Sequence, residues 1–217
     1  MAALVIFDLD GVLVDSETLA VAVEQRILGQ MGWSLSREEI AERFVGRSAH
    51  YMRAEVERHV GRPVNWAREF DPHYVAAFRS ELRAVDGAHE VLAGLGRAVC
   101  VASSSSLEQI QLKLELTGLL DFFAGALFSG EQVAHPKPAP DVFLHAARAM
   151  GYAPRECVVV EDSVVGVRAG LAAGMRVLGL ASELVPRVAL EDLGVEVLAQ
   201  LSELPGALRV TPPANAT

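Results

Sequence analysis

The pattern of apolar residues changes along the chain and predicts two kinds of structure. A short apolar run at residues 3–7 is rich in β-branched and aromatic side chains, which predicts a buried strand. Between residues 16 and 83 the apolar residues recur at helical spacing, as in Leu19, Val23 and Ile27. This second segment predicts about four helices and no convincing strand.

From residue 84 onward, short apolar runs alternate with helical stretches. The predicted strands are residues 98–102, 125–128, 157–160 and 177–180. The predicted helices begin near Gly87, Ser106, Ala139 and Ser163. Such alternation predicts a parallel sheet with helices on both faces. The first strand belongs with this sheet, so we predict an α/β core at residues 1–15 and 84–217 and an inserted helical cap at residues 16–83.

Carboxylates follow two of the predicted strands. Asp8 and Asp10 come directly after the first strand and before Gly11, while Glu161 and Asp162 end another. The carboxyl ends of parallel strands meet at one edge of a sheet, so these acids are expected to converge. Converging carboxylates repel one another unless a cation or a proton lies between them. A hard divalent ion with oxygen ligands resolves this conflict, and Mg²⁺ is the natural candidate.

Two other segments offer groups that suit an anion. Residues 103–106 are four serines between a strand and a helix, where hydroxyls and free N–H groups bind anions. Taken alone, these serines are explained more simply as helix caps. Lys137 lies in a segment stiffened by Pro136, Pro138 and Pro140, although an isolated lysine is usually a surface residue.

Charge and composition exclude some classes of partner. The formal net charge is −9, which argues against nucleic acid or an anionic membrane as the main partner. No apolar run reaches the roughly 20 residues of a membrane span, and we expect no signal peptide. Cys100 and Cys157 lie in apolar runs and are expected to be core thiols of a cytoplasmic protein. We expect a monomer.

The ordered set of motifs resembles the haloacid dehalogenase-like hydrolase superfamily. The motifs are Asp8-x-Asp10-Gly11, the strand end at Ser103, Lys137-Pro138 and Glu161-Asp162. The resemblance is to the subfamily with an α-helical cap after the first strand, in its β-phosphoglucomutase-like and sugar-phosphate phosphatase branch. It implies a Rossmann-like, three-layer core with a parallel sheet and an inserted four-helix cap.

The same resemblance implies roles for the motif residues. Asp8 would be the nucleophile that forms an aspartyl-phosphate, and Asp10 would be the general acid and base. Ser103, the backbone near Ser104, and Lys137 would bind the phosphoryl group. A further set would hold Mg²⁺: the carboxylates of Asp8 and Asp162, the backbone carbonyl of Asp10, and Glu161 either directly or through water.

The reaction implied is phosphoryl transfer, because a dehalogenase has no leaving alkoxide for Asp10 to protonate. Mutases of this branch carry a cap histidine where this chain has Ala20, and their cap arginine falls at Ala49. These departures favour a Mg²⁺-dependent phosphatase for a sugar phosphate or phosphorylated sugar acid. Gly46 and Arg47 are the cap candidates for binding the far end of this small-molecule phosphate ester.

Two alternatives stay open. One is a β-phosphoglucomutase-like phosphosugar mutase that uses the same aspartyl-phosphate. The other is a phospho-accepting regulatory domain, which also combines an acidic pocket, a hydroxyl residue and a lysine. The insertion at residues 16–83 argues against the regulatory domain, which does not need a large helical cap.

Overall fold

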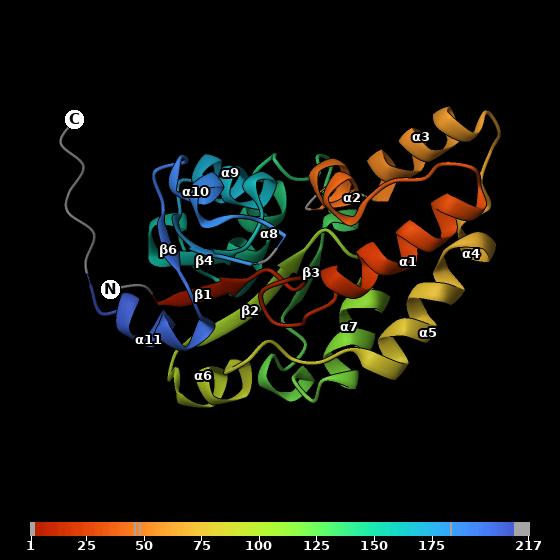
Figure 1. Ribbon diagram of the computed structural model, residues 1–217. Helices are drawn as coiled ribbons and strands as arrows, with labels where there is room; N and C mark the ends of the chain where they lie inside the picture. Colours follow the sequence, from red (N-terminus) through yellow and green to blue (C-terminus); the bar gives the residue numbers. More distant parts are fainter. Residues whose placement is uncertain (1–2, 46, 48, 183, 211–217) are drawn as a thin grey trace.

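A single parallel sheet forms the centre of the protein. The computed structural model describes residues 3–45, 47, 49–182 and 184–210. Six strands of this described part pair in the order β3-β2-β1-β4-β5-β6 (Figure 1). Their bounds are β1 Leu4–Phe7, β2 Ala98–Ser103, β3 Leu127–Ser129, β4 Cys157–Glu161, β5 Arg176–Leu180 and β6 Glu196–Leu198. In the register, Leu4 pairs with Ala98 on one side and with Cys157 on the other, so β1 is central.

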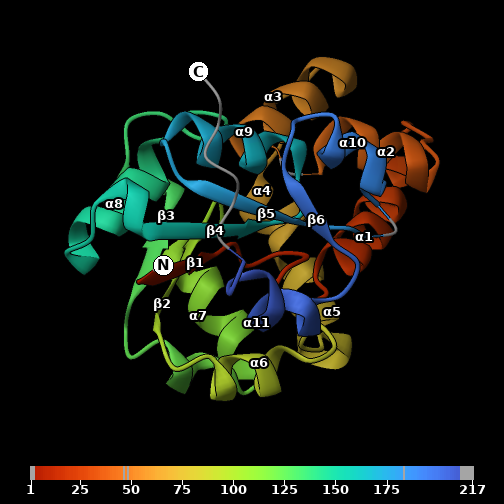
Figure 2. The same cartoon turned by 90° about the vertical axis from the view of Figure 1, so that its left-hand side faces the viewer.

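Helices cover both faces of this sheet, as the alternating pattern predicts. Their bounds are α6 Ala88–Gly94, α7 Leu107–Leu116, α8 Asp141–Met150, α9 Val164–Ala172, α10 Arg187–Glu191 and α11 Leu204–Ala207. Val5 and Phe7 point to the face covered by α6, α7 and α11. Leu4 and Ile6 point to the face covered by α8, α9 and α10. The two groups of helices lie on opposite sides of the strands in Figure 2. The predicted three-layer α/β architecture is confirmed.

A helical block extends from the carboxyl ends of the strands. It contains α1 Glu17–Gln30, α2 Arg37–Phe44, α3 Ala49–Val60, α4 Trp66–Glu69 and α5 Asp71–Glu81 (Figure 1). The block has its own apolar cluster, built around residues such as Ile27, Trp33, Ile40 and Val56. Four helices were predicted, and the described residues add a short fifth, α4, whose Trp66 ring stacks on Phe70 at 3.9 Å.

Two connecting segments join this block to the sheet, and they run side by side. The N–H of Asp15 donates to the carbonyl of Arg83 at 3.0 Å, and the N–H of Val85 donates to the carbonyl of Leu13 at 2.9 Å. Both connections therefore emerge beside the loop that carries Asp8 and Asp10. The division into a core and a cap at residues 15/16 and 83/84 stays a prediction.

Local sequence signals account for most other features, with two differences. The strand predicted at residues 125–128 begins later, at Leu127, because Ala124 and Gly125 both have positive φ and form a turn. Strand β6 was not predicted, because three residues at the sheet edge carry too little periodicity. Cys100 and Cys157 are buried and unpaired with each other, as expected of core thiols. Within the described residues, no helix is both long and apolar enough to cross a membrane.

Candidate active site

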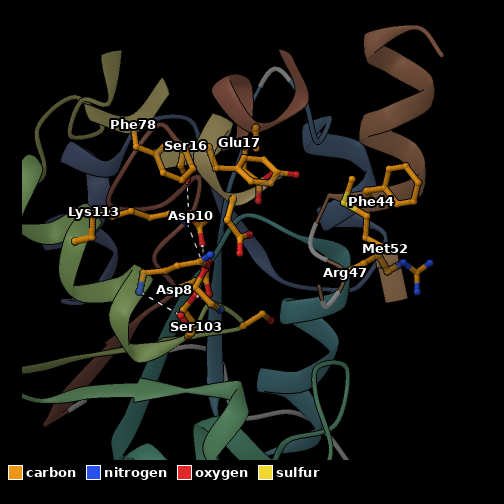
Figure 3. Close-up of a pocket in the computed structure, with 18 of the residues that line it drawn as sticks. Asp8, Asp10, Ser16, Glu17, Phe44, Arg47, Met52, Phe78, Ser103 and Lys113 are labelled. Atoms are coloured by element: carbon orange, nitrogen blue, oxygen red, sulfur yellow. Dashed lines mark hydrogen bonds and ion pairs between the residues drawn. The ribbon is translucent and has the colours of Figure 1, made fainter. Parts of the chain in front are cut away.

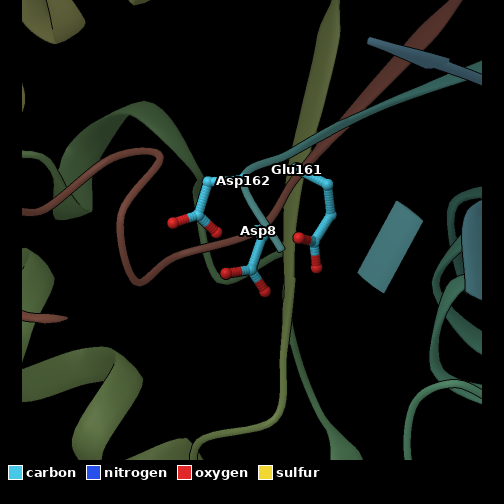
Figure 4. Close-up of side chains that lie close together, drawn as sticks. All are labelled: Asp8, Glu161 and Asp162. Atoms are coloured by element: carbon cyan, nitrogen blue, oxygen red, sulfur yellow. The ribbon is translucent and has the colours of Figure 1, made fainter. Parts of the chain in front are cut away.

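Three carboxylates from two neighbouring strands converge at the edge of the sheet. Asp8 follows β1, Glu161 ends β4, and Asp162 comes next. One oxygen from each lies within 4.8 Å of the others (Figure 4). The pairing of β1 with β4 brings them together, as the sequence predicts. Because all three residues are buried, their mutual repulsion is weakly screened.

Two glycines make this packing possible. Gly11 has a φ of 79°, and a Cβ built on it would lie 1.9 Å from Asp162 Oδ2. A Cβ on Gly166, in the first turn of α9, would lie 1.6 Å from Glu161 Oε1. Both positions therefore exclude any side chain, because the carboxylates of the site occupy the space.

Lys137 supplies the positive charge of this cluster. Its Nζ donates to Asp8 Oδ1 at 2.6 Å, to Glu161 Oε1 at 2.8 Å and to the carbonyl of Ala102 at 3.2 Å. Burial alone would lower the pKa of Lys137, but Asp8 and Glu161 outweigh it and raise the pKa above its ordinary value. The ammonium is therefore held in its charged form. Burial raises the pKa of Asp8 to about 7, although Lys137 opposes that shift.

Glu161 and Asp162 are adjacent in sequence and have different surroundings. The oxygens of Glu161 accept hydrogen bonds from Lys137 and from the N–H and hydroxyl of Ser163, at 2.8 and 2.9 Å. For Asp162, the described residues provide no hydrogen bond. Burial, with Glu161 beside it, raises the pKa of Asp162 well above its ordinary value. Asp162 lines the cavity described below, and a divalent cation between Asp8 and Asp162 would offset the repulsion among the three acids. The donor set thus fits a hard metal ion.

The side chain of Asp10 has different hydrogen-bond partners from the other three acids. Its carboxylate accepts hydrogen bonds from the hydroxyls of Ser16 and Ser105, the latter at 2.9 Å, and from Lys113 Nζ at 2.5 Å. Burial would raise the pKa of Asp10, but Lys113 and the hydroxyls lower it overall. The Asp10 side chain is therefore not part of the three-carboxylate cluster; the predicted role of its backbone carbonyl as a metal ligand stays a prediction.

Sequence reasoning missed Lys113, which lies on α7. Candidate residues were sought at strand ends, and Lys113 is inside a helix. The available signal was its register: it comes three residues after Ile110 and one before Leu114, both fully buried, so a charged side chain is placed at the inner face of α7.

The serines between β2 and α7 have separate functions. Ser106 is the N-cap of α7, since its hydroxyl accepts from the N–H of Gln109 at 3.3 Å. Ser103 is 1% exposed, and its hydroxyl accepts from the N–H of Ser105 at 3.1 Å. All four serines line the cavity described next, and Ser106 also caps the helix.

A cavity of about 470 Å³ lies between the sheet edge and the helical block (Figure 3). The predicted site residues in its wall from the core are Asp8, Asp10, Ser103, Ser104, Lys137, Glu161 and Asp162. The wall from the helical block includes Glu17, Glu24, Arg47, Arg53, Tyr74 and Phe78. Arg47 therefore lies where the sequence predicts, at the cavity, with its guanidinium 5.3 Å from the centre of the Tyr51 ring. Gly46 lies outside the described residues.

The chain belongs to the haloacid dehalogenase-like hydrolase family, whose sequence pattern matches residues 2–174. It is 34% identical to 6-phosphogluconate phosphatase of Escherichia coli over 178 residues, covering 80% of each chain. It is 33% identical to hexitol phosphatase A of the same organism over 213 residues, covering 91% of this chain and 92% of the relative.

A solved structure from the same family is similar to nearly the whole chain. A family hydrolase from Deinococcus radiodurans, crystallised with bound phosphate and sodium, has a TM-score of 0.78 and 34% identity, over 98% of this chain and 99% of that one. The family membership and the phosphatases among its relatives define the protein as a phosphoric monoester hydrolase.

Proposed function

We propose that the protein is a Mg²⁺-dependent phosphatase that hydrolyses a small sugar phosphate or phosphorylated sugar acid through a phosphorylated Asp8. One observation carries the proposal: the Asp8 carboxylate lies between the Lys137 ammonium, at 2.6 Å, and the unpartnered carboxylate of Asp162. A carboxylate so placed has a cation on one side and space for a metal ion on the other.

Asp8 and Asp162, with the backbone carbonyl of Asp10, would hold the Mg²⁺. When bound, the ion offsets the negative charge that accumulates when a phosphoryl group approaches these acids. Glu161 is engaged by Lys137 and Ser163, so we assign it to orienting Lys137 and to contacting the metal through water.

In the first step an Asp8 oxygen attacks phosphorus, and the bond from phosphorus to the ester oxygen breaks. Asp10 donates a proton to the departing alkoxide. In the second step Asp10 takes a proton from water, whose oxygen attacks phosphorus and releases Asp8 and inorganic phosphate. Lys137, Ser103 and the backbone near Ser104 stabilise the charge on the phosphoryl oxygens in both steps.

The cavity and the relatives support the proposed substrate class. A volume of about 470 Å³ suits a small metabolite. Two relatives that each span four fifths or more of the chain are phosphatases for 6-phosphogluconate and for hexitol phosphates. The bound phosphate in the Deinococcus radiodurans structure supports an anion site in this fold. A monomeric state and a cytoplasmic location stay predictions of the sequence.

A screen of phosphorylated metabolites, with Mg²⁺ and with a chelator, tests this function. We expect release of inorganic phosphate that needs no bisphosphate activator and stops when the metal is removed. Asp162→Asn should weaken Mg²⁺ binding, seen as a higher Mg²⁺ concentration for half-maximal rate. Conversion between phosphosugar isomers without release of phosphate would instead support the mutase alternative.

A further inference from the structure

A buried acid in the cavity wall has no role in the reaction just described. Glu24 lies on α1, seven residues after Glu17, and both residues line the cavity. Residues seven apart lie on the same face of a helix. Glu24 is only 7% exposed, and the described residues give its carboxylate one hydrogen bond, from the Tyr74 hydroxyl to Oε1 at 2.8 Å.

This acid is poorly compensated for a buried group. Its recorded partner is a neutral phenol on α5, and burial raises the pKa of Glu24 to about 7. A carboxylate buried without a cationic partner weakens a fold. Its position in the wall of the active-site cavity therefore points to a ligand that it contacts when the cavity is filled.

We propose that Glu24 and Tyr74 bind hydroxyl groups at the end of the substrate remote from the phosphate, and that they select a neutral, hydroxyl-rich end over an anionic one. This inference rests on the proposed function and deepens it by naming the chemistry of the substrate's far end.

Hydrogen-bond chemistry supports this selection. A carboxylate only accepts, and the one proton of the Tyr74 hydroxyl is already donated to Glu24, so both groups offer acceptors to which a sugar hydroxyl can donate. A carboxylate at the far end of the substrate would offer no donor. It would also meet the negative charge of Glu24, and like charges placed together oppose binding.

Arg47 lies on a different part of the cavity wall from Glu17. Figure 3 shows Arg47 with Phe44 and Met52, whereas Glu17 lies on the side of Ser16 and Phe78. The guanidinium of Arg53 lies over the Trp66 ring, 5.5 Å from its centre. The charged residues with which α1 lines the cavity are both acids, Glu17 and Glu24.

The test compares two probes that differ only at the far end. D-glucitol 6-phosphate ends in a CH₂OH group, and 6-phosphogluconate ends in a carboxylate. The readout is the ratio of kcat/KM for the two probes, at about pH 8. The anionic probe escapes the repulsion only when Glu24 carries a proton. At about pH 8, one unit above the Glu24 pKa of about 7, only about one molecule in ten carries that proton. We therefore expect the wild-type protein to favour the neutral probe about tenfold in kcat/KM.

Glu24→Gln should reduce this preference about tenfold, because it removes the charge and keeps the shape. Glu24→Asp, which keeps the charge, should retain the preference and serves as the second variant if Glu24→Gln does not fold. Tyr74→Phe should raise KM for the neutral probe. Glu42→Gln is the matched control, since it removes one negative charge from an exposed position on α2.

Each outcome bears on one proposal. A wild-type preference for 6-phosphogluconate, or a ratio that Glu24→Gln leaves unchanged, would overturn the role of Glu24 while leaving the phosphatase intact. If the wild-type protein hydrolyses no phosphate ester at all, the proposed function itself fails.

Discussion

Lys113 Nζ lies 2.5 Å from Asp10 Oδ1, and this contact joins α7 to the loop after β1. The two side chains are 7% and 17% exposed, so the ion pair is largely shielded from water. The same ammonium lies 4.9 Å from the centre of the Phe78 ring on α5. Lys113 therefore contacts both the proposed general acid, Asp10, and the helical block, through Phe78. Asp10 must gain a proton before it can protonate an alkoxide, and the Lys113 ammonium beside it opposes that gain because it lowers the pKa of Asp10.

A double-mutant cycle on Lys113→Met and Asp10→Asn tests this buried ion pair. Each single change leaves one buried charge without its partner, and we expect each to lower the free energy of unfolding by about 3 kcal/mol. The double variant removes both charges and should be destabilised by less than the sum of the single variants. Urea unfolding measures all four proteins. Additivity within about 0.5 kcal/mol would show that the two side chains do not interact in solution.

The raised pKa of Glu24 predicts how stability depends on pH. In the unfolded chain the carboxyl titrates near 4.5, and in the folded protein burial raises its pKa to about 7. Between these values the folded state binds more protons, so this group lowers stability as the pH rises. Glu24→Gln should therefore match the wild type near about pH 4 and exceed its free energy of unfolding by up to about 3 kcal/mol above about pH 8.

Urea unfolding of both proteins across this range is the measurement. Glu42→Gln serves again as the exposed control and should leave the free energy of unfolding unchanged both near about pH 4 and above about pH 8. A pH-independent difference between Glu24→Gln and the wild type would mean that Glu24 is not buried as a titrating group.

Two glycine substitutions on helices should have opposite effects. Gly166→Ala places a methyl group 1.6 Å from Glu161 Oε1, and Glu161 in turn holds Lys137. We expect a loss of about 2 kcal/mol or more in unfolding free energy, together with loss of phosphatase activity. At Gly29, on α1, nothing lies within 4 Å of an added Cβ, so Gly29→Ala should gain about 0.5–1 kcal/mol. Thermal unfolding and one activity assay distinguish the variants; equal behaviour of the two would contradict the packing around Glu161.

The fold and the core of the site were predictable because their signals are local. A strand followed by acids fixes where Asp8 lies, and the pairing of β1 with β4 brings Glu161 and Asp162 to it. Proline on both sides of Lys137 marked a lysine that the structure buries against Asp8. The confirmed family membership agrees with the ordered motifs.

The missed residues depend on contacts between distant segments. Asp10 and Lys113 are 103 positions apart, and Glu24 and Tyr74 are 50 apart. Periodicity places Lys113 and Glu24 on helix faces, but which face meets the cavity depends on how α1, α5 and α7 pack. Ser103 and Ser106 both line the cavity, and only the structure shows that it is the Ser106 hydroxyl that caps α7.

The central claim is that Asp8 carries the phosphoryl group during turnover. The most direct measurement is rapid quenching of the reaction, reduction with borohydride and mass spectrometry of the peptide that contains Asp8. Borohydride converts an acyl phosphate at Asp8 to homoserine, and we expect this product only when both Mg²⁺ and substrate are present. Asp8→Asn should give neither the product nor turnover, while keeping its fold. Turnover without modification at position 8, or modification at another residue, would contradict the account.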